Sequence, residues 1–208
     1  SPSGCSLSRH ELLERAREWV APYWNARHLY RTLDWLFVLD PEANLALRLA
    51  ALTHDMERHF PAPDAPKMDA RFGIPNREYE RRHQERSARI VAAWLAEQRV
   101  PPELIEAVRA LVAVHEWGGW PEADLLQAAD SLSFLEVNVD RFVQLGLTGE
   151  RGYTPERVAE HFRYMAQRIR VPRARPLADL LLRRALARLE ERSGHPAAMC
   201  VQEGVADG

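Results

Sequence analysis

The chain has 208 residues, of which 46% are hydrophobic and 28% charged, a composition that fits a globular protein with an apolar core and excludes a disordered or collagen-like chain. Its 28 lysines and arginines against 30 aspartates and glutamates give a net charge of −2, which argues against general nucleic-acid binding. The two cysteines lack metal-ligand spacing and no apolar run is long enough to span a membrane, so we expect a cytoplasmic protein.

Helix signals follow one another along the chain, and no segment has the alternating pattern of a β-strand. Ser8 with Glu11 forms a capping box, and Asp40-Pro41 has the pattern of an N-cap followed by a proline in the first turn. Segment 60–75 holds four prolines and is expected to be a surface loop. The sequence therefore predicts an all-α protein with helices at about 8–22, 23–39, 40–54, 76–98, 101–115 and 121–145, and two more that begin at 154 and 175.

These elements predict one compact helical domain at 8–192. Its core would span about 23–146, and helices at 154–192 would follow it. Residues 1–7 are expected to be a remnant without fixed structure, and the small polar residues of 193–208 predict a flexible tail.

Four of the eight histidines and two carboxylates fall on the apolar faces or at the ends of expected helices. A single histidine of this kind is more often a core residue with one hydrogen-bond partner. A buried carboxylate, however, needs a partner or a cation, and one shared metal centre would satisfy all six groups together. The candidate ligands are His28, His54, Asp55, His83, His115 and Asp130.

The ligand type narrows the choice of metal. Imidazole and carboxylate without thiolate favour Fe, Mn, Ni, Co or Zn and exclude a cysteine-type zinc site. Six ligands exceed what one catalytic ion with an open position needs, so we expect two divalent ions bridged by Asp55. A paired site of this kind suits phosphoryl transfer to water.

The order of these residues resembles the HD-domain superfamily of metal-dependent phosphohydrolases, in the variant with two extra histidines. Segment 52–58, LTHDMER, is similar to the family's motif around the histidine–aspartate pair, and His83, His115-Glu116 and Asp130 fall in segments similar to its other ligand motifs. The resemblance covers 28–138, roughly half of the chain. It implies a compact helical bundle with the metal site in its core.

The resemblance also implies roles for individual residues. His28, His54, Asp55 and Asp130 would hold the first metal, and His83 and His115 the second. A hydroxide bridging the metals would be the nucleophile, and Arg58 would bind the scissile phosphate. Arg31, one turn from His28, and Lys67, in the proline-rich loop, are further candidates for substrate binding. Arg58 stands where hydrolases of guanosine tetraphosphate and of deoxynucleoside monophosphates carry a glutamate, which argues against those two substrates.

Three functions remain open from the sequence. The leading one is hydrolysis of a nucleotide or another small phosphate ester. The alternative is a di-iron oxygenase of the same superfamily that activates dioxygen for C–C or C–P bond cleavage; its phosphonate-cleaving branch usually has a histidine at the position of Arg58. A non-catalytic binding module is disfavoured because all six ligands are present. We expect a small phosphorylated substrate and no membrane partner, and a homodimer is left open.

Overall fold

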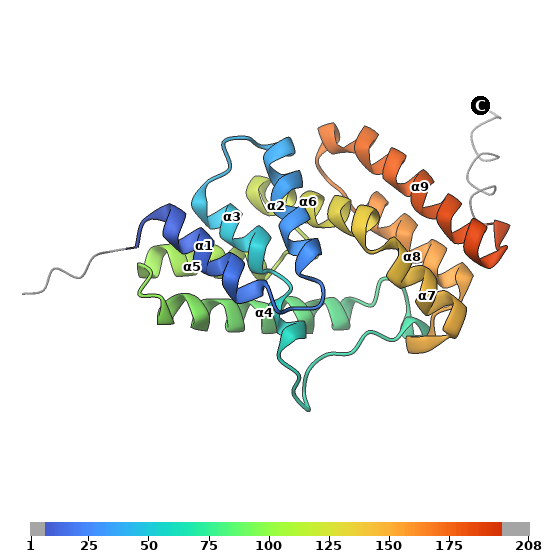
Figure 1. Cartoon of the computed structure of the whole chain (residues 1–208), viewed down its shortest axis with the longest axis horizontal. Coiled ribbons are helices and arrows are strands. Elements are labelled where there is room, and N and C mark those ends of the chain that lie inside the picture. The colour runs from blue at the N-terminus through green and yellow to red at the C-terminus, as the bar shows by residue number, and fades with distance from the viewer. Residues whose placement is uncertain (1–6, 197–208) are drawn as a thin grey trace, which may run out of the picture. The chain divides into compact units, whose positions relative to one another are not determined.

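The computed structural model describes residues 7–196. Their regular secondary structure is helical and includes no strand, so the predicted all-α class is confirmed. Most of the remnant predicted at 1–7 and of the tail predicted at 193–208 lies outside the described residues. None of the described helices is both long and apolar enough to cross a membrane. The α-helices, shown in Figure 1, are α1 (Arg9–Val20), α2 (Ala26–Leu39), α3 (Leu45–Thr53), α4 (Arg77–Glu97), α5 (Pro102–Val112), α6 (Pro121–Val137), α7 (Val139–Thr148), α8 (Pro155–Gln167) and α9 (Arg175–Ser193).

The described residues form two compact units, one comprising 7–66 together with 78–130, the other comprising 67–77 together with 131–196. The prediction of a single domain at 8–192 stays a prediction. In the first unit, α1, α2 and α5 each pack against α3. Seven of the nine residues of α3 are buried, as expected for a central helix that is apolar nearly all round. The end of this helix therefore delivers His54 and Asp55 into the core.

The second unit is built on α7, α8 and α9, which pack against one another. Its core contains Phe134, Phe142 and Phe162, whose rings meet edge to face. Tyr153 and His161 join this cluster and hydrogen-bond to each other over 2.9 Å between the Tyr153 hydroxyl and His161 Nδ1. His161 is thus satisfied inside an aromatic core.

Two predicted boundaries are wrong. Asp40 does not begin a helix: it ends α2, with its backbone N–H donating to Leu36 O, and α3 begins only after Asn44, whose side chain accepts from Leu47 N over 2.9 Å. The helix predicted at 121–145 is two helices, because the chain leaves helical geometry at Asn138 between α6 and α7. The capping box of Ser8 and Glu11 is present as predicted.

Candidate metal centre

The structure brings the six predicted ligands together inside the first unit. His28 lies on α2, His54 and Asp55 directly follow α3, and His83 lies on α4; His115 follows α5 and Asp130 lies on α6. Three of the imidazoles are fully buried, and none of the six residues is more than 4% exposed. Six polar side chains are therefore held away from water in a single core.

Within this cluster, two imidazoles converge on the carboxylate of Asp130. His28 Nε2 lies 2.9 Å and His54 Nε2 3.2 Å from Asp130 Oδ1. In the same cluster, His83 Nε2 lies 3.0 Å from Asp55 Oδ1, and His115 Nε2 lies 3.3 Å from Glu116 Oε1. Three overlapping groups, each with its ligand atoms within 4.8 Å of one another, could each hold a metal ion: His28, His54 and Asp130; His54, Asp55 and His115; His83, His115 and Glu116.

The outer nitrogens of three imidazoles are occupied by acceptors behind the rings. His54 Nδ1 bonds to Ala51 O over 3.0 Å and His115 Nδ1 to Val112 O over 2.7 Å. Since a carbonyl can only accept, each of these bonds places a proton on Nδ1. For His115 this leaves the Nε2 lone pair facing the cluster, whereas His54 Nε2 is also hydrogen-bonded to Asp130 Oδ1 over 3.2 Å. His83 Nδ1 is held in the same way by Glu57 Oε2 over 2.6 Å.

The inner nitrogens of two of these rings have no hydrogen bond. His83 Nε2 and His115 Nε2 are buried and make none within the described structure, although a carboxylate oxygen lies close to each. A buried nitrogen left in this way is costly unless it has a ligand. An imidazole fixed through Nδ1 with a free inner Nε2 is the arrangement found at metal sites, so the residues present fit a divalent metal ion.

Burial and charged neighbours shift the pKa values of several cluster residues. Burial would raise the pKa of Asp55, but Arg58 and His83 outweigh it and hold that pKa well below its usual value. Burial and Arg58 would lower the pKa of His83, but the surrounding oxygen groups raise it to about 10. Burial, together with His54 and His83, lowers the pKa of His115.

Arg58 lies beside the cluster, with a side chain 35% exposed. Its Nη1 donates to Asp55 Oδ2 over 3.2 Å and its Nη2 to the Tyr79 hydroxyl over 2.8 Å. The predicted substrate-binding residue is therefore beside the candidate metal ligands.

The other two candidates for substrate binding lie elsewhere. Arg31 donates to Asp34 over 2.9 Å and lies over the ring of Trp35, so it is engaged on the surface of α2. Lys67 is exposed and belongs to the second unit. A role for either residue in binding substrate stays a prediction.

Three residues around the cluster were not predicted from the sequence. The Tyr23 hydroxyl donates to Asp55 Oδ2 over 2.8 Å, and no sequence signal marked this tyrosine. Glu57, which holds His83, and Glu116, which joins the third ligand group, lie within the motif segments quoted above but were given no role there. Their chemical type was a usable signal, because a carboxylate next to a histidine ligand is a common support or ligand.

Comparison with protein-family models, with curated proteins and with solved structures found no match to this chain.

Proposed function

We propose that the chain is a metal-dependent phosphohydrolase of the HD type that acts on a nucleotide or another small phosphate ester. One observation carries the proposal: three histidines are fixed through Nδ1 from outside, so that their Nε2 atoms converge with buried carboxylates beside Arg58. A metal centre accounts for the convergence, and a fixed, partly exposed guanidinium beside it suits a phosphoryl group.

Two ions would use the ligands best. His28, His54 and Asp130 would hold the first together with Asp55, and His83 and His115 would hold the second, with Asp55 between them. Glu116 is close enough to His83 and His115 to add a ligand to the second ion. Bound divalent ions would supply a water molecule activated near neutral pH and positive charge opposite the phosphate oxygens.

The protein's own groups would position the carboxylate and the substrate. Tyr23 donates to Asp55 Oδ2 and so directs Oδ1 toward His83. Arg58 has donors beyond the bonds to Asp55 and Tyr79, and its partly exposed position would let the guanidinium hold a phosphate beside the metal centre.

The first experiment is to determine the metal content of protein purified without chelator and to assay phosphate release from a panel of nucleotides and small phosphate esters. We expect about two ions per chain and phosphate release without oxygen consumption. Asp55→Ala should lose metal and activity together. His10→Ala, which removes an exposed histidine, is the control and should keep both.

Two results would overturn the proposal. Full turnover by Asp55→Ala after its metal is lost would remove the centre from the reaction. Two irons per chain with oxygen uptake and no phosphate release would instead indicate the di-iron oxygenase.

A further inference from the structure

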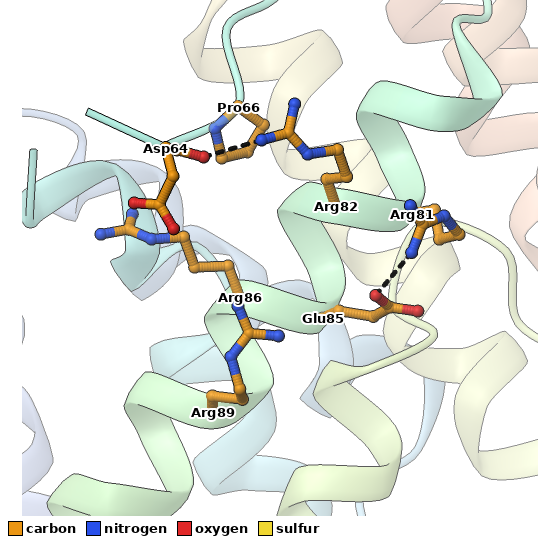
Figure 2. A pocket seen from close by; sticks show the side chains of 7 residues that line it. All are labelled: Asp64, Pro66, Arg81, Arg82, Glu85, Arg86 and Arg89. Carbon is orange, nitrogen blue, oxygen red and sulfur yellow. Dashed lines mark hydrogen bonds and ion pairs between the residues drawn. The ribbon is translucent and has the colours of Figure 1, made fainter. Parts of the chain in front are cut away.

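A second group of charged side chains gathers on the outer face of α4. It lines a pocket of about 200 Å³ formed by Asp64, Pro66, Arg81, Arg82, Glu85, Arg86 and Arg89 (Figure 2). All seven residues belong to the first unit. The lining brings four guanidinium groups and two carboxylates together, and two further carboxylates, those of Glu57 and Glu78, pair with Arg86 and Arg81. What the pocket offers an anion is therefore set by the arginines that are left without such a partner.

The four arginines of the pocket differ in how many hydrogen bonds and ion pairs they already make with the protein. Arg81 is fully occupied, because it pairs with Glu78 and with Glu85. Arg86 is also committed: its Nη1 donates to Glu57 Oε1 and to Glu57 O, and its Nη2 donates to Phe60 O. These two arginines shape the pocket.

Arg82 and Arg89 keep donors for a ligand. Arg82 makes one bond, from Nη2 to the backbone carbonyl of Asp64 over 2.8 Å. Arg89 makes no hydrogen bond or ion pair to any described residue, and the same holds for the Asp64 carboxylate. Figure 2 shows Arg82, Arg86 and Arg89 following one another along α4, as the four- and three-residue spacings of one helix face require.

We propose that this pocket is an anion site that takes a small phosphate-bearing ligand, separate from the metal centre. Planar guanidinium forks match the oxygens of a phosphate and bind it in pairs. The volume admits a compact anion of the size of pyrophosphate. The Asp64 carboxylate makes no ion pair in the described structure and would repel an anion, so it is expected to limit the affinity of the site. The proposal does not depend on the reaction at the metal centre.

Arg86 connects the pocket to the metal centre and so is excluded from the test. Its guanidinium holds Glu57, which holds His83, so replacing Arg86 would disturb both places. Arg82 and Arg89 have no such link in the described structure, which makes Arg82→Ala with Arg89→Ala the appropriate change. Arg9→Ala with Arg27→Ala removes the same charge from exposed positions of α1 and α2 and serves as the control.

Calorimetric titration of the full chain with inorganic pyrophosphate tests the site. The Asp55→Ala variant removes the metal centre as a place where pyrophosphate could bind, and this variant should still bind pyrophosphate at the arginine pocket. If circular dichroism shows that Asp55→Ala does not fold, chelator-treated wild-type protein is used in its place. In that background the Arg82→Ala, Arg89→Ala pair should weaken binding by roughly tenfold or more. The control pair should not, and Asp64→Asn should tighten binding. In the wild-type background, the arginine pair should leave metal content unchanged.

Three outcomes would overturn the proposal. They are equal affinity in the arginine pair and its control, binding that disappears with Asp55→Ala and with chelator treatment, and no binding at millimolar pyrophosphate. The second outcome would assign the anion to the metal centre alone.

Discussion

Three of the four imidazoles of the candidate metal centre, those of His54, His83 and His115, are held by acceptors that lie behind them. His54 and His115 use carbonyls three residues earlier in their own chain segments, which the helix ends supply without any further residue. His83 lies within α4 and depends on a side chain, Glu57, for the same purpose. Of these three rings, only His83 can therefore lose its Nδ1 acceptor through a single side-chain substitution.

Glu57→Gln should weaken metal binding. Both oxygens of Glu57 accept, Oε2 from His83 Nδ1 and Oε1 from Arg86 Nη1. A glutamine of the same shape has one acceptor oxygen, so one of the two donors loses its partner. We expect metal affinity to fall roughly ten- to hundredfold, measured by competition with a chromophoric chelator. Glu85→Gln, at a surface ion pair with Arg81, should leave the affinity unchanged; an equal loss in both variants would contradict a specific role for Glu57.

Tyr23→Phe should destabilise the metal-free chain. The hydroxyl is buried and donates to a carboxylate, and hydrogen bonds to charged groups are worth about 1.5 to 3 kcal/mol. Urea unfolding of chelator-treated protein measures this loss. Tyr30→Phe removes a longer bond, of 3.3 Å, to the carbonyl of Arg17 and should cost about 1 kcal/mol or less. The two variants are compared by their loss in free energy of unfolding. A larger loss for Tyr30→Phe would show that the hydrogen bond from Tyr23 to Asp55 adds little stability.

At the scale of single elements, α3 connects the fold to the site. The helix is enclosed by α1, α2 and α5, and His54 and Asp55 follow it directly. Its start was mispredicted because Asp40-Pro41 and Asn44 both carry helix-capping signals, and local pattern does not rank them. In the structure the Asp40 backbone is extended and its side chain accepts from Glu42 N, which closes a turn. Asn44 is left to cap α3.

Asn44→Ala should therefore destabilise the fold more than Asp40→Ala. Loss of a side-chain N-cap costs about 1 kcal/mol, within a range of about 0.5 to 2, and the Asn44 bond to Leu47 N is 2.9 Å long. The Asp40 side chain accepts one bond, within a turn, so its replacement should cost less. Denaturant midpoints of the two variants give the comparison. A larger loss of stability in Asp40→Ala would instead support the sequence prediction that Asp40 caps this helix, α3.

At the scale of the whole molecule, the sequence predicted the features that depend on residue type and helical spacing. The helix starts marked by Ser8, Thr154 and the prolines of α5 and α6 are present, and the six candidate ligands lie together because each falls on a buried helix face or end. Contacts between distant segments could not be predicted. Tyr23 reaches Asp55 only because the turn after α1 packs against the end of α3, and the arginine pocket requires the loop at 64–66 to lie over α4.

Metal binding should be visible in the stability of the whole chain. A cation that binds only the folded state stabilises it by about 2.7 kcal/mol at a free concentration one hundred times its dissociation constant. We therefore expect thermal unfolding to shift to lower temperature when chelator is added to protein as purified, and to return when Mn²⁺ is restored in excess. The shift arises because buried imidazoles and carboxylates lose the charge that holds them together.

The variants locate the origin of that shift. Asp55→Ala should unfold at the same temperature with and without chelator, since the ligand shared by the two proposed ion positions is gone. His10→Ala, at an exposed position, should keep the full shift. A chelator effect of equal size in Asp55→Ala would assign the stabilising ion to another part of the chain. In that case the convergence of Nε2 atoms would be a hydrogen-bonded core and no metal centre.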